Sequence, residues 1–215
     1  MARVGRESMN KNLKRSDEHA VSPVVGVMLM LAVTIIIAAV VSAFAGGMGS
    51  STQKAPQASI DVKIKTGMDD TMGGTNTVMT FMELSGDPIQ TKDIAIVTYY
   101  KNKEGTVFKN KQTATSLATE LYGTSKFTRV PFINDMRYGY SGNNPAKDFG
   151  NYTWKTGDVL STGNTAGTAQ LLAINSTTIP YTISDSDFGS GSIVDVKILH
   201  IPSGQYIFNK EVSVQ

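Results

Sequence analysis

The chain has 215 residues, no cysteine, two histidines and a formal net charge of +2. The absence of cysteine excludes disulfide bonds and thiolate metal sites. The first 20 residues hold five Lys/Arg and three Asp/Glu, so the remainder is neutral, and its charge does not indicate a nucleic-acid partner. The sequence contains no phosphate-binding glycine loop, nucleophile elbow or HExxH motif. We therefore expect no enzyme, no catalytic residue, no cofactor and no metal site.

An uncharged apolar stretch, VSPVVGVMLMLAVTIIIAAVVSAFA, occupies residues 21–45. It is long enough to cross a bilayer as a helix. It is apolar on every side rather than along one stripe, so the whole helix surface needs lipid or protein around it. Ser22 is a suitable cap and Pro23 suits a first helical turn. The sequence therefore predicts a transmembrane or filament-core helix over 21–45.

Small residues recur along this helix at intervals of four positions. Such rows allow the backbones of neighbouring helices to approach closely. The alternative is a plain membrane anchor that happens to contain alanines. The candidate helix-packing residues are Gly26, the row of Ala38, Ser42 and Gly46, and the row of Ala39, Ala43 and Gly47.

Residues 1–20 read as a polar leader peptide. Their basic excess beside an apolar span holds this end in the cytoplasm and directs the C-terminal part outside. The apolar stretch is far longer than the roughly 7–15-residue apolar region of an ordinary signal peptide. Conventional secretion remains an alternative, because Ala43-Phe44-Ala45 is similar to a signal-peptidase site.

The block HAVSPVVGVML at 19–29 resembles the N-terminal signature of archaeal type IV pilins. In that family a membrane prepilin peptidase removes the leader before the apolar helix. The resemblance implies cleavage between Ala20 and Val21. Two later segments are similar to pilin features: LSGDPI at 84–89 to a GGDP-type turn, and LHIPSGQYI at 199–207 to the final hairpin.

The pattern changes after the helix. Glycine, serine and proline at 46–57 indicate a flexible hinge. From Ala58 onward apolar and polar residues alternate, as in a half-buried strand. Many short strands without alternating helices predict an extracellular domain over 58–215. The fold class is thus α+β: a long apolar helix, then an antiparallel β-sandwich or barrel, Ig-like. Further strands are expected at 77–84, 93–100, 168–174, 179–183, 192–200 and 205–214, and a short helix at 112–122 stopped by Gly123.

A few other residues carry chemistry of their own. Asn151 and Asn175 begin N-glycosylation sequons. His200 is interpreted as a structural hydrogen-bonding residue. The segment 185–191 has a faint calcium-loop pattern but lacks the distal glutamate, so we expect an ordinary hairpin loop. The aromatic stretch 127–140 is interpreted as core and loop anchoring rather than as a binding surface.

The resemblance implies a pilin, a structural subunit of an archaeal type IV pilus-like filament for surface adhesion. Its partners would be identical subunits in a helical filament, the prepilin peptidase and the pilus assembly machinery. The precursor would lie in the plasma membrane, and the mature chain in an extracellular filament. Two alternatives remain open: an archaellin of the archaeal swimming filament, and a monomeric membrane-anchored extracellular binding module.

Overall fold

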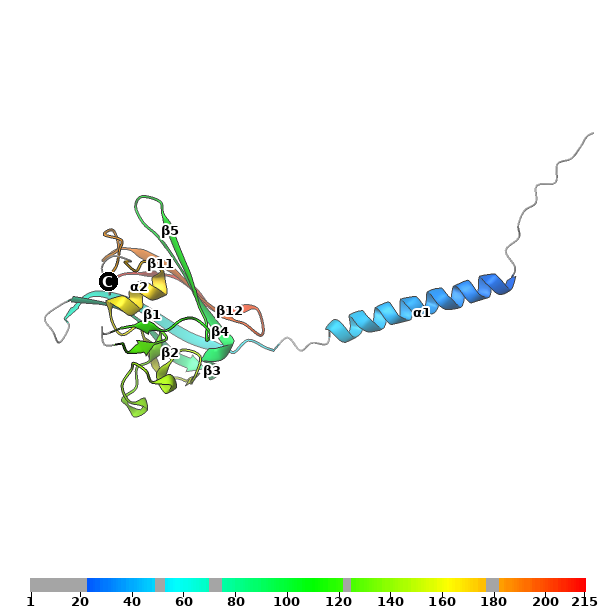
Figure 1. The fold of residues 1–215 in the computed structure, drawn as a ribbon, viewed down its shortest axis with the longest axis horizontal. Coiled ribbons are helices and arrows are strands. Elements are labelled where there is room, and N and C mark those ends of the chain that lie inside the picture. Colours follow the sequence, from blue (N-terminus) through cyan, green and yellow to red (C-terminus); the bar gives the residue numbers. More distant parts are fainter. Residues whose placement is uncertain (1–22, 49–52, 70–74, 122–124, 177–181) are drawn as a thin grey trace, which may run out of the picture. The chain divides into compact units, whose positions relative to one another are not determined.

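The computed structural model describes residues 23–48, 53–69, 75–121, 125–176 and 182–215. The chain divides into two compact units, Met1–Ser51 and Thr52–Gln215. The first unit contains helix α1 (Pro23–Met48), and the second contains all strands found among the described residues (Figure 1).

Helix α1 ends three residues later than the sequence predicts, because it includes Gly46 and Gly47. Glycine in a helix costs only about 1 kcal/mol relative to alanine. Continuing a formed helix by one residue needs no new nucleus. The first part of the predicted hinge is therefore helical, while residues 53–57 lie in neither helix nor strand.

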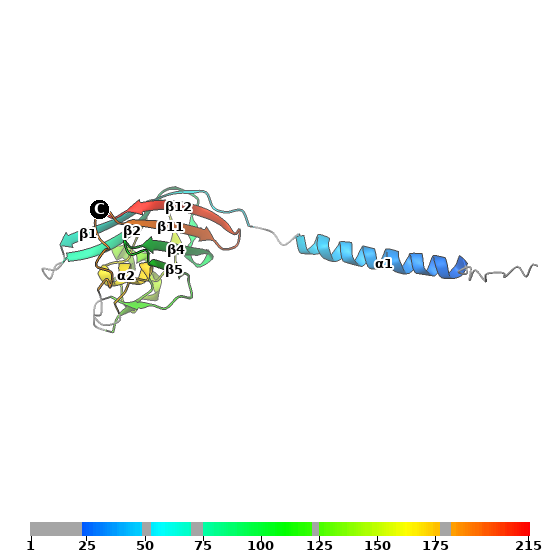
Figure 2. The same cartoon turned by 90° about the horizontal axis from the view of Figure 1, so that it is seen from above.

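The second unit is built from two four-stranded antiparallel sheets that face each other (Figure 2). The first sheet has the order β1 (Ala58–Asp69), β2 (Thr75–Gly86), β10 (Val159–Ser161), β8 (Phe132–Ile133). The second has the order β12 (Gln205–Ser213), β11 (Ile193–His200), β4 (Ile94–Lys101), β5 (Val107–Gln112). Two short pairs complete the strands: β3 (Ile89–Gln90) with β9 (Thr153–Trp154), and β6 (Thr119–Glu120) with β7 (Phe127–Thr128).

The strand order is that of an immunoglobulin sandwich. Taken across each sheet, the first sheet corresponds to strands A, B, E and D, and the second to G, F, C and C′. The predicted Ig-like α+β fold is confirmed. The two sheets are not closed into a barrel. They meet at a parallel bridge between Ile64 and Val214, where the Gln215 N–H donates to the Ile64 carbonyl over 2.9 Å.

One apolar core lies between the sheets. It follows from the alternation along the long strands: Val194, Val196 and Ile198 of β11 point inward, as do Met79 and Phe81 of β2. Antibody domains join their sheets with a disulfide, but this chain has no cysteine. Apolar packing therefore holds the two sheets together.

The predicted strand at 168–174 is wrong, because this region is helix α2 (Thr165–Leu172). The Asn164 side chain caps the helix by accepting from the Gly167 N–H over 3.1 Å. Its carbonyl end is also satisfied: the Thr98 hydroxyl and the Asn110 amide donate to the Leu171 carbonyl over 2.7 and 3.0 Å. Thr98 and Asn110 lie far from α2 in the sequence. Contacts with distant residues therefore stabilise a helix where the local residue pattern predicted a strand.

The predicted short helix at 112–122 is also wrong. Gln112 ends β5, Thr113 to Ser116 form a turn, and β6 follows. The Thr113 N–H donates to the Ser116 hydroxyl over 2.9 Å. Serine and threonine hydroxyls that bond to nearby backbone compete with helix formation. The predicted stop at Gly123 lies outside the described residues, as does most of the expected strand at 179–183.

The sheet edges are blunted in different ways. In the second sheet, edge strand β5 carries exposed Lys109 and Lys111, and in the first sheet edge strand β8 has only two residues. Short edges and lysines discourage pairing with another chain. The remaining two edges, of β1 and β12, approach each other at the Ile64–Val214 bridge.

Candidate functional site

Helix α1 is the candidate assembly site. Every side chain described on it, residues 23–44, is exposed, including Met30 at 71% and Phe44 at 68%. Within the described part of the chain, it is the one helix long and apolar enough to cross a membrane. An all-round apolar helix of this length does not stay bare in water. Lipid or other protein must therefore cover it.

The polar groups of α1 suit apolar surroundings. The Thr34 hydroxyl donates to the Leu31 carbonyl within the helix over 2.9 Å. The first turn carries no acidic residue and the last turn no basic one. An apolar environment tolerates backbone and side-chain polar groups only when they are satisfied internally. Nothing charged would have to be buried when the described helix is covered.

The helix geometry places four of the predicted packing residues on one face of α1. At about 100° per residue, Ala39, Ser42, Ala43 and Gly46 fall on one side of the C-terminal half of α1. Phe44 and Val41 lie on the opposite side. We call the first group the small-residue face. Ala38 and Gly47 flank it.

Gly26 does not join the small-residue face. It lies five turns before Phe44 and therefore on the opposite side of the helix. A Cβ atom added at Gly26 would meet nothing within 4 Å. The predicted cleavage residues, Ala20 and Val21, lie outside the described residues.

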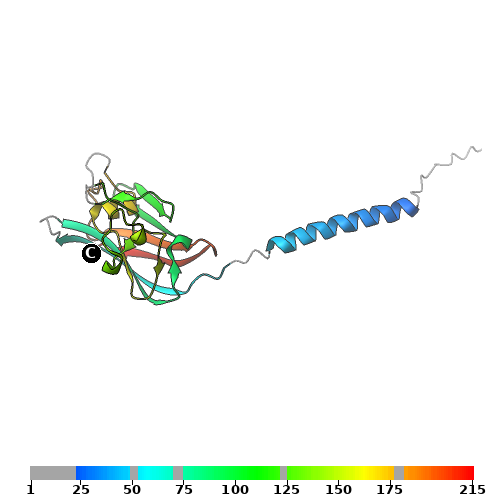
Figure 3. The same cartoon turned by 60° about the horizontal axis from the view of Figure 1, so that its bottom comes forward.

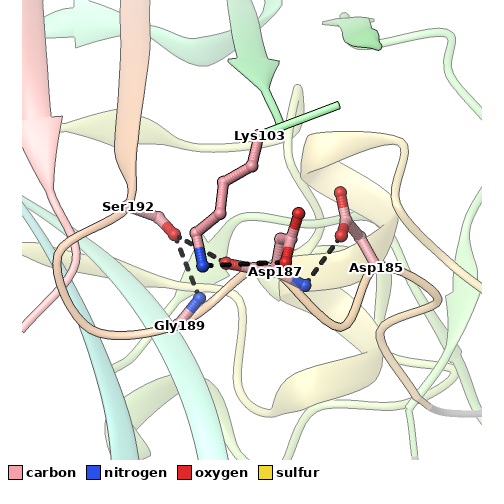
Figure 4. A network of polar contacts seen from close by, with 5 residues as sticks. All are labelled: Lys103, Asp185, Asp187, Gly189 and Ser192. Carbon is pink, nitrogen blue, oxygen red and sulfur yellow. Dashed lines mark hydrogen bonds and ion pairs between the residues drawn. The ribbon is translucent and has the colours of Figure 1, made fainter. Parts of the chain in front are cut away.

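The loop with the calcium-like pattern makes hydrogen bonds within itself and one contact with Lys103 (Figure 4), while Asp185 Oδ2 has no hydrogen-bond partner among the described residues. The Asp187 N–H donates to Asp185 Oδ1 over 2.8 Å, and the Ser192 hydroxyl donates to the Asp187 carbonyl over 3.2 Å. Lys103 Nζ lies 3.7 Å from Asp187 Oδ1. Among the described residues, no group of three or more His, Asp or Glu side chains is placed to hold a metal ion.

A hollow of about 590 Å³ opens between this loop and the β4–β5 turn. Tyr100 lies at its base and packs edge-on against Phe188, with ring centroids 5.1 Å apart. Burial raises the pKa of Tyr100, and the carboxylate of Asp185 adds to the shift. The phenol therefore stays neutral, as expected of a core residue.

His200 has the structural role that the sequence indicates. It is buried, and its Nδ1 lies 2.8 Å from the Ser203 hydroxyl in the β11–β12 turn. The ring thus fastens the turn that joins the last two strands.

The aromatic stretch 127–140 divides into two parts. Val130, Phe132 and Ile133 are buried in the core. Tyr140 is 80% exposed, and Met136 is also exposed. The interpretation as core anchoring therefore describes the middle of this stretch rather than its end.

A partly buried arginine and a buried lysine, which the sequence did not single out, hold the loops that follow β5. Arg129 donates to the Ser116 and Phe149 carbonyls over 2.7 and 2.9 Å. Lys147 is 2% exposed and donates to the Gly139 carbonyl over 2.9 Å. Burial lowers the pKa of Lys147. Both cations satisfy backbone carbonyls of loops, which no local sequence pattern reveals.

A buried acid, Glu83, was missed as well. It lies on the core side of β2 and is fully buried, and its Oε2 atom has no hydrogen-bond partner among the described residues. The Thr156 hydroxyl reaches Oε1 only at 3.5 Å. Burial raises the pKa of Glu83 to about 7, and the nearby carboxylates of Asp158 and Asp87 add to the shift.

The two sequon asparagines are accessible. Asn151 and Asn175 are both exposed. The Asn151 amide donates to the Pro145 carbonyl over 2.8 Å, and Asn175 forms an isolated bridge with Ile183.

The chain thus has two parts: an uncovered apolar helix, and a β-sandwich domain with its own apolar core. The family model described as the N-terminal domain of archaeal type IV pilins matches residues 19–60. This match covers the end of the polar N-terminal segment, all of α1 and the beginning of β1. The resemblance expected from the sequence is confirmed over these residues.

A second comparison matches a longer stretch of the chain to a curated protein of an archaeon. An uncharacterized protein of Archaeoglobus fulgidus is 34% identical over 90 residues, which is 42% of this chain and 59% of that protein. The match thus spans less than two thirds of the relative's length. No solved structure matches the chain.

Proposed function

We propose that this protein is a pilin, the structural subunit of an archaeal type IV pilus-like filament. The observation that carries the proposal is the uncovered apolar helix α1 within the segment that matches the archaeal pilin N-terminal domain. A helix with no buried face in its own chain needs an environment supplied by lipid or by other subunits. Pilins use both in succession.

The helix would first anchor the precursor in the plasma membrane, with the leader in the cytoplasm. After cleavage between Ala20 and Val21, it would move from lipid into a bundle of identical helices. Lipid and a helix bundle are similarly apolar, so close packing must favour the bundle. Identical subunits joined by an operation that does not close form a helical fibre.

The β-sandwich would coat the filament and meet solvent and surfaces. No catalytic role is assigned to it: processing and assembly would be performed by the prepilin peptidase and the assembly machinery. Exposed Asn151 and Asn175 would carry N-glycans on this coat. Surface adhesion is the role proposed for the finished filament.

Filaments sheared from cells should contain this chain with Val21 as its first residue. The reason is that the prepilin peptidase would cut before the apolar helix, leaving α1 intact for packing. Electron microscopy of the sheared material and mass spectrometry of its subunit provide the measurement. A first residue at Gly46 would instead establish conventional secretion. An unprocessed chain that stays in the membrane without filaments would establish an anchored binding module.

The small-residue face predicts a specific assembly defect. Changing Ala43 to leucine should leave membrane insertion intact, since leucine is at least as apolar as alanine. It should lower filament yield severalfold, because extra methyl groups in a tight helix contact typically cost about 1–3 kcal/mol. The same contact would recur in every subunit. The measurement is filament yield relative to membrane-bound subunit in cells carrying the variant as their only copy.

The matched control is Val41→Leu, which also enlarges an aliphatic side chain but lies about 200° around the helix from Ala43. We expect filament yield to remain near that of the natural chain. Equal yields for both variants would disprove packing through the small-residue face while leaving the pilin function in place. Loss of membrane insertion in Ala43→Leu would contradict the account of α1 itself.

A further inference from the structure

The turn after β2 lies where the linker enters the β-sandwich. Linker residues 53–57 lead into β1 at the end of the sandwich where β3 and the β11–β12 turn lie, and the C-terminus lies at the other end (Figures 1 and 3). The turn contains Gly86 and Asp87, within the segment that is similar to the GGDP-type turn of pilins. The fold alone does not require an acidic residue there.

Asp87 holds the linker with two hydrogen bonds. Its backbone N–H donates to the Gln57 carbonyl over 2.9 Å, and its Oδ2 accepts from the Gln57 N–H over 3.0 Å. Both backbone polar groups of Gln57 are thereby occupied by one residue. A carboxylate acceptor makes the second bond stronger than one between neutral groups.

Gly86 allows the linker to come this close. A Cβ atom at this position would lie 2.2 Å from the Gln57 carbonyl oxygen and 2.5 Å from Ala58 Cα. Its φ of +132° is also a conformation that residues with side chains rarely adopt. Glycine and aspartate at 86 and 87 therefore act together on the same linker residue.

The pairing of β1 with β2 shows why such a hold matters. Ala58 and Ser59 pair with Gly86 and Ser85, and a register irregularity then separates them from the next pair, Ile60 with Glu83. The first two pairs are therefore isolated from the regular ladder. A sideways pull on the linker would open them one at a time.

We infer that Gln57, Gly86 and Asp87 form a linker clip, which fixes the direction in which the linker leaves the sandwich and prevents β1 from peeling away from β2 when the linker is pulled. With the clip closed, a pull reaches β1 along its length and loads many ladder hydrogen bonds together. With the clip open, the bonds would be loaded in succession. This mechanical role rests on the proposed filament function.

The test uses the full chain in detergent micelles, where no filament is needed. Asp87→Ala removes the Oδ2 acceptor, so the Gln57 amide should exchange its hydrogen about tenfold faster, as expected for loss of one charge-assisted hydrogen bond. Trypsin should then cut more rapidly after Lys63 and Lys65 in β1. Cleavage after Lys54, which precedes the clip, serves as the internal reference and should not change.

Two further variants make the result specific. Asp87→Asn keeps an oxygen acceptor and should largely restore protection of the Gln57 amide. Glu104→Ala removes an exposed acidic side chain in the β4–β5 turn and should leave both readouts unchanged. Unchanged exchange at Gln57 in Asp87→Ala, or equal acceleration in Glu104→Ala, would overturn the clip.

Filaments supply an independent readout. In filaments of Asp87→Ala, electron cryo-microscopy should show an ordered helical core with a blurred outer domain. An outer domain as sharp as in the natural filament would refute the orienting role. If the natural chain forms no filaments, the proposed function fails, while exchange at Gln57 still decides whether the clip exists.

Discussion

Replacing Gly167 with alanine is expected to lower the free energy of unfolding of the β-sandwich by about 2–3 kcal/mol. A Cβ atom at this position of α2 would lie 2.0 Å from the Thr162 carbonyl oxygen and 3.1 Å from Leu121 Cδ2. Helix α2 would have to move away from Thr162. The Thr168 hydroxyl, which donates to the Thr77 carbonyl of β2 over 2.8 Å, opposes this movement. Alanine's higher helix propensity, about 1 kcal/mol, does not offset this clash.

The measurement is thermal unfolding of the full chain in micelles, followed by the fluorescence of the single tryptophan, Trp154, which is fully buried in the sandwich. The midpoint should fall by roughly 4–12 °C. Gly189→Ala is the matched control, because a Cβ atom there meets nothing within 4 Å and the backbone is not left-handed. A Gly167→Ala variant as stable as Gly189→Ala would contradict the tight contact between α2 and Thr162.

Replacing Glu83 with glutamine is expected to stabilise the sandwich at alkaline pH and not at acidic pH. Burial raises the pKa of Glu83 from 4.5 to about 7, so the folded chain binds this proton more tightly than the unfolded chain. Stability from this group is therefore complete below about pH 4.5 and falls as the pH rises to about 7. Above pH 7 the buried charge costs roughly 3 kcal/mol, and glutamine avoids it.

Urea unfolding at pH 5 and pH 8.5, again followed by Trp154 fluorescence, measures the effect. We expect Glu83→Gln to exceed the natural chain by about 1–3 kcal/mol at pH 8.5 and to differ little at pH 5. Glu104→Gln, at an exposed position, should show no difference at either pH. A gain of equal size at both pH values would contradict the prediction, because it would mean that the gain does not come from the loss of the Glu83 proton between pH 5 and pH 8.5.

The sequence predicts the long elements well, for physical reasons that particular residues illustrate. In α1, uninterrupted apolar residues leave no other environment than lipid or protein. In β11, Val194, Val196 and Ile198 alternate with polar residues, so the inward face is unambiguous. Long periodic patterns of this kind outweigh local irregularities, which is why the helix and the main strands appear where they are expected.

Glu83 was not predictable, because β2 is apolar on both faces. Met79 and Phe81 point into the core, whereas Met82 and Leu84 are exposed. Either register would bury apolar residues, and the sequence favours the one that leaves the acid outside. The pairing with β1 and β10 decides otherwise, and Glu83 follows Phe81 into the core.

The sequence predicted part of the packing face on α1 but not the contacts of the linker clip. Periodicity places Ala39 and Ala43 on one side of α1, but helix geometry also separates Gly26 from them. The linker clip was visible only as a turn motif, since its partner Gln57 is 30 positions away from Asp87. Side-chain contacts with distant backbone, such as those that cap α2, leave no local trace in the sequence.

The protected sheet edges affect whether copies of the proposed precursor would associate with one another before assembly. In the proposed function, copies tethered by α1 would share a thin layer at the membrane, so their sandwiches would meet at far higher local concentration than free domains would. An open strand edge would pair with its neighbour under such crowding. Lys109 and Lys111 on β5 and the two-residue length of β8 oppose that pairing. In the proposed membrane-anchored precursor, a reserve of subunits would therefore lie side by side without pairing through their sheet edges.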